Sequence, residues 1–354
     1  MNRTLTLALP LAISLAAVAS AAADPRPTTD TGPAPHARGP AAADAGAMPL
    51  VVSPAWLAAH LADRDLVILH VGDGDAYRTR HLPGGRLVAL SDISVSMQGD
   101  KALHLELPAP EDLRHRLEAL GISNDSRVVV YFADDWTSPA TRVVFTLDAA
   151  GLGAHAALLD GGMPTWLRAG HPVTEVVPPA RTGKLARLAM RPIVVDANAV
   201  LASLGKPGFA VVDARDKAYY DGTQTGGMHG HPHRTGHIAG AVSIPYDSVF
   251  DDRLVLRASD DLAARFTRAG VKPGDTVIGY CHIGQQATAM LFAARRLGHP
   301  VLLYDGAFED WSQFYPVFPV ETTPGAAPAT PNAPDRATDQ APGKANVKAP
   351  AGQP

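Results

Sequence analysis

The sequence predicts an α/β protein made of two copies of one domain. Short apolar segments alternate with segments of helical spacing, a pattern typical of a mostly parallel sheet with helices on both faces. The 354-residue chain also repeats itself, because the sequence around Tyr131 and Trp166 returns around Tyr280 and Trp311. A repeat of this length indicates two domains of the same fold rather than a solenoid.

The first copy begins with a helix start signal. Ser53 is a good N-cap and Pro54 suits the first helical position, so we expect a helix over 54–61. Apolar runs bounded by turn residues predict the strands, and apolar residues at helical spacing predict the other helices. The expected strands are 66–71, 127–132 and 156–159, and the further helices are 111–120, 141–150 and 164–169.

The second copy follows the same order of elements. The turn Pro273-Gly274-Asp275 leads into an apolar strand, and Gly298 ends the helix that begins at Ala287 beyond it. The expected strands are 209–213, 241–244, 277–280 and 301–304, and the other helices are 198–204, 260–269 and one around Trp311.

Two flanking segments cannot bury a core. Residues 24–48 and 322–354 consist mostly of Ala, Pro, Gly, Thr and Asp with almost no bulky apolar residues, so we expect a disordered linker and a disordered tail. The repeat lies between them. It divides into a first domain at 49–173, a connector at 174–195 and a second domain at 196–321.

Residues 1–23 have the pattern of a secretory signal peptide. Arg3 precedes a largely apolar run that extends to Val18, and small residues follow, with cleavage expected after Ala21 or Ala23. An uncleaved anchor is the alternative, although the apolar run is short for a membrane span. We therefore expect a periplasmic or secreted bacterial protein that has no membrane contact after cleavage.

The only cysteine, Cys281, follows the strand 277–280 and precedes the helix that begins at Ala287. The N–H groups and dipole of a helix N-terminus stabilise an anion, which favours the thiolate, and Gly284 lets the loop curl its amides around the sulfur. A lone cysteine is more commonly a small buried apolar residue, and that alternative stays open. In an exported protein it cannot form an internal disulfide, so Cys281 is either inert or present for its reactivity.

Several short motifs follow one another in the second copy of the repeat. They are Val212-Asp213-Ala214-Arg215, Gly236-His237-Ile238-Ala239-Gly240-Ala241 with Pro245, Cys281 after its strand, and Asp305-Gly306 with Trp311. Weaker counterparts in the first copy are His81-Leu82-Pro83-Gly84 and Asp160-Gly161-Gly162 with Trp166. Taken together and in order, these motifs resemble those of tandem-domain rhodaneses, a family that includes thiosulfate and 3-mercaptopyruvate sulfurtransferases.

The resemblance implies two rhodanese-like domains, of which the second is catalytic. In the first, Phe132 stands at the position of Cys281, and the longer loop 133–138 after it contains no thiol. Its acidic residues would repel an anionic substrate. We therefore expect the first domain to be a structural partner that shapes one wall of the active-site cleft.

The resemblance also implies sulfur transfer through a persulfide on Cys281. The thiolate attacks the outer sulfur of an anionic donor such as thiosulfate, and cyanide or a thiol then accepts that sulfur. Backbone amides would stabilise the charge on sulfur; those expected to contribute are Ile283, Gly284, Gln285 and Gln286. His282 either adds positive charge to this cradle or faces solvent. No cofactor and no metal are expected.

Two departures from the family pattern concern the donor. One is in the active loop; the other is the arginine found near the start of the second domain in many members, which is shifted here, because Lys217, Tyr219 and Tyr220 follow Arg215. Thiosulfate-preferring members carry cationic residues in the active loop, whereas Ile283 stands here where a lysine is expected. Arg215 either binds anion or forms a structural ion pair with Asp213 or the loop backbone, and the ion pair is favoured. We still expect thiosulfate to be preferred over 3-mercaptopyruvate.

Histidines are dense in residues 228–237, which have the sequence MHGHPHRTGH. Such a cluster can ligate a metal. Glycines flank it, however, no Cys, Asp or Glu lies within it, and His237 already belongs to the family motif. We favour a second role, in which Arg234 or the histidines of 229–237 border the cleft and supply the positive charge that the loop lacks.

Competing function classes lack a residue or a charge that they require. A cysteine-based phosphatase of related fold needs an arginine six residues after the nucleophile, where this chain has Ala287. A dithiol oxidoreductase needs a second cysteine. The formal net charge of −4 gives no electrostatic footprint for nucleic acid. The alternative left open is a persulfide carrier or binding module that serves another exported protein without turnover.

Overall fold

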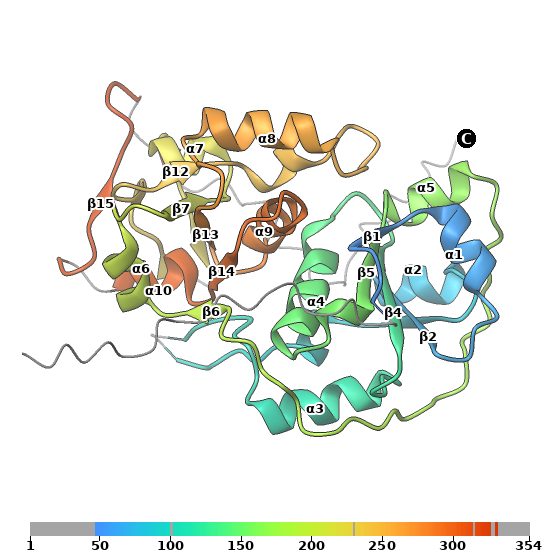
Figure 1. The fold of residues 1–354 in the computed structure, drawn as a ribbon. Helices are drawn as coiled ribbons and strands as arrows, with labels where there is room; N and C mark the ends of the chain where they lie inside the picture. Colours follow the sequence, from blue (N-terminus) through green and yellow to red (C-terminus); the bar gives the residue numbers. More distant parts are fainter. Residues whose placement is uncertain (1–46, 100–101, 229–230, 314–315, 327–329, 332–354) are drawn as a thin grey trace, which may run out of the picture. The chain divides into compact units, whose positions relative to one another are not determined.

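The computed structural model describes residues 47–99, 102–228, 231–313, 316–326 and 330–331 (Figure 1). These residues form two parallel five-stranded sheets with helices on both faces, which confirms the predicted fold class. Among the described residues, no helix has the length and apolar character that a membrane crossing demands. The predicted signal peptide 1–23 lies outside the described residues.

The first sheet has the strand order β1-β5-β4-β2-β3, and all of its pairs are parallel. Its strands are β1 (Val51–Val52), β2 (Leu66–Val71), β3 (Gly85–Leu87), β4 (Arg127–Phe132) and β5 (Ala156–Leu159). Its helices are α1 (Pro54–His60), α2 (Gly74–Thr79), α3 (Pro110–Ala119), α4 (Ser138–Ala149) and α5 (Gly162–Arg168), with 3₁₀ turns at Leu90–Asp92 and Gly153–His155.

Strand β4 shows how the sheet divides its side chains. Val128 and Val130 pack into the core shared with α3 and α4, whereas Val129 and Tyr131 pack into the core shared with α1 and α5. Successive side chains of a strand point to opposite faces, so an unbroken apolar run is required when both faces are covered.

The second sheet repeats this arrangement with the order β12-β7-β13-β14-β6, again all parallel. Its strands are β6 (Val194–Val195), β7 (Phe209–Asp213), β12 (Val242–Ser243), β13 (Thr276–Tyr280) and β14 (Val301–Tyr304). Its helices are α6 (Ala197–Ser203), α7 (Lys217–Asp221), α8 (Ser259–Arg268), α9 (Ala287–Arg296) and α10 (Ala307–Gln313), with a 3₁₀ turn at Tyr246–Val249. Helices α6 and α10 contribute to the core on one face, and α8 and α9 to that on the other.

The two domains share one apolar core. Helix α4 of the first domain packs against α9 of the second, as Figure 1 shows near its centre. Val143 and Leu147 of α4 belong to the same buried cluster as Met290 and Ala294 of α9. Apolar packing therefore joins the domains in addition to the connector.

Two flanking segments are more ordered than the sequence predicted, and the connector contributes a strand. Val194–Val195, at the end of the predicted connector 174–195, forms the edge strand β6. In the predicted tail, Thr323 donates from its backbone N–H to Asp221 O at 3.2 Å. In the predicted linker, Met48 donates from its N–H to Ala154 O at 2.7 Å. Such segments escaped prediction because backbone hydrogen bonds fix them and composition does not reveal those bonds. The rest of both flanks, 24–46, 327–329 and 332–354, lies outside the described residues.

Short antiparallel pairs surround the second domain. β11 (His237–Ile238) pairs with β15 (Val320–Glu321), and β9 (Gly227–Met228) pairs with β10 (His231–Pro232). A parallel pair joins β8 (Gln224–Thr225) to β16 (Thr330–Pro331). Two-residue strands carry no periodic signal, so the sequence did not predict them.

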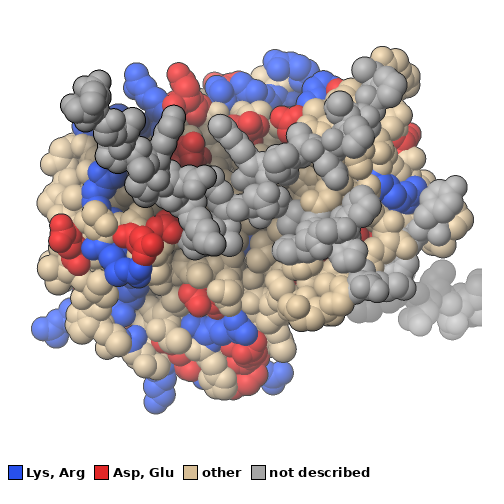
Figure 2. Space-filling model, turned by 180° about the vertical axis from the view of Figure 1, so that it is seen from behind, with Lys and Arg blue, Asp and Glu red and all other residues tan. Residues whose placement is uncertain are grey.

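The surface carries both signs of charge. Figure 2 shows basic and acidic side chains intermixed over the face that it presents. This mixture of charges on that face agrees with the small formal net charge of −4.

Candidate active site

Cys281 lies where the sequence placed it, at the carboxyl end of an inner strand. It follows β13, which pairs with β7 on one side and β14 on the other, and it precedes α9. The residue is fully buried, and all residues of the loop up to Ala287 are buried as well. This position, at the carboxyl edge of a parallel sheet, is where ligands bind in open α/β folds.

Three backbone amides surround the sulfur. The N–H groups of Ala287, Ile283 and Gln286 form hydrogen bonds to it. Two of the four residues expected to cradle the sulfur, Ile283 and Gln286, therefore do so, and Ala287 was missed. Its contribution was predictable, because the first amides of a helix have no partner within the helix.

The electrostatic result at Cys281 differs from the predicted bias toward thiolate. Burial is the largest influence and raises the pKa of the Cys281 thiol; the three amides lower it, and the nearby Asp213 raises it. Desolvation disfavours the charged form, so the amides offset only part of its effect. In this conformation the thiol is favoured relative to a free cysteine.

The other two loop residues face the first domain. Gly284 has φ +77°, and its carbonyl accepts a hydrogen bond from Arg142 Nη1 at 3.2 Å. The side chain of Gln285 donates to Ser138 Oγ at 3.1 Å. These residues therefore connect the loop to α4 of the first domain, and that domain forms one wall of the site.

The loop after Phe132 is not longer than the Cys281 loop. Helix α4 begins at Ser138 and α9 begins at Ala287, the same distance from Phe132 and Cys281 respectively. The helix that follows the loop is longer in the first domain, because α4 has 12 residues and α9 has 10. Helix α4 also begins three residues before the predicted Thr141, and this extra turn contributes Ser138 to the interface.

Arg215 forms the structural ion pair that the sequence favoured. Its Nη2 donates to Asp213 Oδ2 at 2.6 Å and to Gly236 O at 2.7 Å, and both charged side chains are buried. Asp213 also accepts from the hydroxyl of Tyr280 at 2.8 Å. The guanidinium lies 4.0 Å from the ring centroid of Phe308. These contacts satisfy the charge of Arg215 within the fold.

His282 does not face solvent. The residue is buried, its Nδ1 lies 3.4 Å from Nδ1 of His233, and its ring meets the edge of Tyr219 at a centroid distance of 4.7 Å. Gly226 packs so closely on the ring that a Cβ there would lie 2.6 Å from His282 Cε1. The histidine-rich segment therefore covers the active loop.

The charge predicted for these histidines is wrong at His233. Burial lowers the pKa of His233 well below its ordinary value, and the neighbouring His282 and Arg215 lower it further. A neutral imidazole at physiological pH supplies no positive charge to an anionic donor.

Arg234 is hydrogen-bonded to residues near the C-terminal end of the second domain. Its Nη1 donates to Phe318 O at 2.6 Å, and its backbone N–H donates to Ser312 Oγ at 3.2 Å. Its predicted part in substrate binding stays a prediction. Within the residues that the structure describes, no three His, Cys, Asp or Glu side chains are grouped as metal ligands; His229 and Gly230 lie outside them.

Sequence reasoning missed the residues that the first domain contributes. Thr141 Oγ1 lies 2.9 Å from Thr288 Oγ1, and Arg142 reaches the loop and Asp305. A signal for Arg142 was present, because it is the only charged residue in the first turns of a helix of small and apolar residues. An arginine in a helix that is buried on all sides must have partners.

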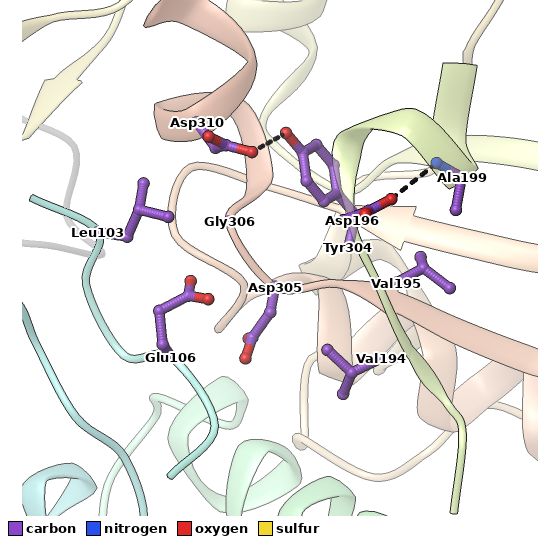
Figure 3. A pocket seen from close by; sticks show the side chains of 10 residues that line it. All are labelled: Leu103, Glu106, Val194, Val195, Asp196, Ala199, Tyr304, Asp305, Gly306 and Asp310. Carbon is purple, nitrogen blue, oxygen red and sulfur yellow. Dashed lines mark hydrogen bonds between the residues drawn. The ribbon is translucent and has the colours of Figure 1, made fainter. Parts of the chain in front are cut away.

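An acidic pocket of about 580 Å³ lies beside Asp305, between the domains. Figure 3 shows Leu103 and Glu106 of the first domain across from Asp305 and Asp310 of the second. Burial, and then the charge of Asp305, raise the pKa of Glu106 to about 8. Carboxylates repel an anionic sulfur donor, so this pocket does not suit one.

Comparisons with known proteins agree with the fold of both domains. The family model of the rhodanese-like domain matches residues 53–169 and 196–314. A thiosulfate sulfurtransferase of Azotobacter vinelandii is 28% identical over 78% of this chain and 99% of its own length. A probable 3-mercaptopyruvate sulfurtransferase of Pseudomonas aeruginosa is 30% identical over 72% of this chain and 92% of its own.

Among solved structures, SseA of Escherichia coli, described as a 3-mercaptopyruvate sulfotransferase, superposes with a TM-score of 0.63 and 26% identity. The superposition covers 73% of this chain and 99% of SseA. The structure of YnjE gives a TM-score of 0.68 at 26% identity and covers 77% of this chain and 68% of that one.

Proposed function

The chain belongs to the rhodanese family, and from that membership we propose that it moves sulfane sulfur from thiosulfate to cyanide or a thiol through a persulfide on Cys281. The sulfurtransferases among its relatives support sulfur transfer in general. The observation that carries the proposal is the cradle of three amides around the sulfur of the single cysteine.

The proposed reaction has two displacements at sulfur. The Cys281 thiolate attacks the outer sulfur of thiosulfate, the sulfur–sulfur bond of the donor breaks, and sulfite leaves with the electron pair. The acceptor then attacks the outer sulfur of the Cys281 persulfide, the new sulfur–sulfur bond breaks, and the thiolate is restored. With cyanide the product is thiocyanate. Negative charge stays on sulfur throughout, so donors aimed at that position stabilise each state.

The amides of Ile283, Gln286 and Ala287 are the groups that fulfil this role. Burial raises the pKa of the thiol, so attack requires a thiolate held by these amides as the donor approaches. Cys281 has no exposed surface in this conformation. Turnover therefore includes an opening step that admits the donor.

The choice of thiosulfate as donor is part of the proposal. The relatives include both thiosulfate and 3-mercaptopyruvate sulfurtransferases at similar identity. Ile283 provides no cation at the loop position, and Arg215 is paired with Asp213. Both donors should therefore be tested in parallel.

The decisive experiment measures thiocyanate formation by the purified mature protein beside Cys281→Ser. Turnover with thiosulfate that disappears in the variant supports the proposal. Turnover only with 3-mercaptopyruvate would reassign the donor. No turnover with either donor by a folded protein would contradict the enzymatic proposal and favour a non-turnover persulfide carrier or binding module for another exported protein.

We also propose that the protein is exported, on the strength of residues 1–23. Expression of the full chain in a bacterium, followed by fractionation and N-terminal sequencing, tests this. A periplasmic product that begins at Ala22 or Asp24 is expected. A cytosolic product that retains Met1 would contradict export.

A further inference from the structure

Arg142, from the non-catalytic domain, contacts the Cys281 loop directly. Its Nη1 donates to Gly284 O at 3.2 Å and to Asp305 Oδ1 at 2.6 Å. Its Nη2 donates to the carbonyl of Leu105. The side chain is fully buried, so one guanidinium joins α4, the active loop and the end of β14.

A charge is costly at this position unless it is paired. Arg142 and Asp305 are both buried, and breaking a buried pair by removing one partner is strongly destabilising. Asp305 is itself held in place, because its Oδ2 accepts from the N–H of Leu107 at 2.7 Å. The planar fork of an arginine can bind two carbonyls and a carboxylate together, whereas a lysine would act as a single point charge.

The local backbone is adapted to this contact. Gly284 has a φ value that favours glycine, and a Cβ there would lie 2.9 Å from Asp305 Oδ1 and 3.1 Å from Arg142 Nη1. The loop therefore approaches the ion pair with its backbone. Ile283 and Gln286, in the same loop, direct their amides at the sulfur of Cys281.

We propose that Arg142 is a positioning residue, which holds the Gly284 carbonyl and so keeps the amides of the same loop convergent on the sulfur of Cys281. In a concave arrangement of amides the carbonyls point outward, and an outward anchor fixes the curvature. The catalytic consequence of this inference rests on the proposed sulfurtransferase function. The geometric consequence does not.

The test compares Arg142→Met and Arg142→Lys with Arg295→Met, all in the full chain. Arg295 is a matched control, because it also joins the domains, from α9 to Asp148 Oδ2 and to Gly153 O at 3.2 Å each. It lies at the far end of α9 from the loop. Loss of Arg295 therefore weakens the interface without altering the loop anchor.

The first measurement is the rate at which iodoacetamide alkylates Cys281, followed against pH. Because Cys281 is the only cysteine, the midpoint of this profile reports its thiolate with or without enzyme activity. We expect Arg142→Met to raise the midpoint by about one pH unit, and Arg142→Lys, which keeps the charge and loses the fork, by about half a unit. Arg295→Met should leave it unchanged.

The second measurement is the kinetics of thiocyanate formation. Arg142→Met should lower kcat about 100-fold with little change in KM, because misplaced donors weaken the transition state more than donor binding. A midpoint and kcat in Arg142→Met that match those of Arg295→Met would overturn the proposal. If Arg142→Met does not fold, the same comparison with Arg142→Lys decides it. If the wild-type protein shows no turnover, the proposed function fails, and the alkylation profile still decides the role of Arg142.

Discussion

The two domains build the same frame with the same hydrogen bonds. Tyr131 at the end of β4 bonds the N–H of Leu82 at 3.0 Å, and Tyr280 at the end of β13 bonds that of Ile238 at 3.1 Å. His81 and His237, which precede those residues, each bond a backbone carbonyl through Nδ1. Trp166 and Trp311 also donate to equivalent carbonyls. The frame is therefore independent of which domain carries the thiol.

The domains differ at the ends of two neighbouring strands. In the first domain His70 faces Tyr131, with its Nδ1 2.6 Å from the hydroxyl, whereas in the second Asp213 faces Tyr280. Gly72 stands where the second domain has Arg215, so the first domain has a neutral pair and the second an ion pair. The two domains thus share a frame and differ at a few positions within it.

The two domains also differ at the position of the thiol. Phe132 fills the place of Cys281, and its ring comes so close to Gly162 that a Cβ there would lie 2.5 Å from Phe132 Cδ2. The second domain has Ala307 at the matching position, with φ 52°. A small residue at the strand end therefore permits a side chain on the facing turn, and a large ring excludes one.

The prediction with the largest expected effect tests whether a cysteine at position 132 is enough to give the first domain an active site. Phe132→Cys in a Cys281→Ser background should form thiocyanate at less than about 1% of the wild-type rate, because we expect the acidic loop after Phe132 to disfavour a thiolate at that position. Asp134 and Asp135, which are exposed in the loop after Phe132, add repulsion toward an anionic donor. Cys281→Ser alone is the baseline. Restored turnover would show that the first domain retains a complete cradle.

The ion pair of the second domain provides the next contrast. Asp213→Asn keeps the shape of the side chain and leaves the buried guanidinium of Arg215 without a counterion, so we expect a loss of about 3–5 kcal/mol in the free energy of unfolding. His70→Asn, at the equivalent strand position of the first domain, should cost about 1 kcal/mol, the value of one hydrogen bond. Urea unfolding of both variants measures the difference. Equal losses in the free energy of unfolding would mean that the ion pair stabilises the fold no more than the hydrogen bond of His70 does.

His70 predicts an acid sensitivity that belongs to the first domain. Burial, and then the proximity of His81, lower its pKa to about 4. Its folded pKa lies below that of an unfolded histidine, so its contribution to stability is present above pH 6.5 and is lost as the pH falls toward 4. Between pH 7 and pH 4.5 the wild type should lose about 2.5 kcal/mol more than His70→Gln, which does not titrate. Parallel losses in the two proteins would contradict this assignment.

The sequence predicted the frame well because the frame is periodic. The strands 66–71, 127–132, 156–159, 209–213 and 301–304 have the predicted bounds, since long apolar runs between turn signals leave little choice. The position of Cys281 followed from the same pattern. Its amide cradle was predicted in part, through Ile283 and Gln286.

The features of the site that the sequence could not predict depend on contacts between segments far apart in the chain. Arg142 and Gly284 are brought together by the packing of α4 on α9, and no local pattern reports that packing. The raised pKa of Cys281 has the same origin, because it follows from how completely both domains exclude water from the thiol. Local signals place a residue at the end of a strand, and tertiary packing decides its ionisation.

The prediction with the smallest expected effect tests whether a large ring at position 281 and the side chain of Ala307 exclude each other. Cys281→Phe should lower the free energy of unfolding by about 2 kcal/mol, because the ring meets the side chain of Ala307 in a packed core. Adding Ala307→Gly should restore about 1 kcal/mol, since it recreates the glycine that faces Phe132 and removes the cost of a positive φ at alanine. Ala307→Gly alone is the control and measures the backbone part of the gain. A gain in the double variant no greater than in that control would show that the ring does not need the glycine. Packing against Ala307 would then not require a small residue at position 281, and the chemistry of the thiol alone would explain the cysteine.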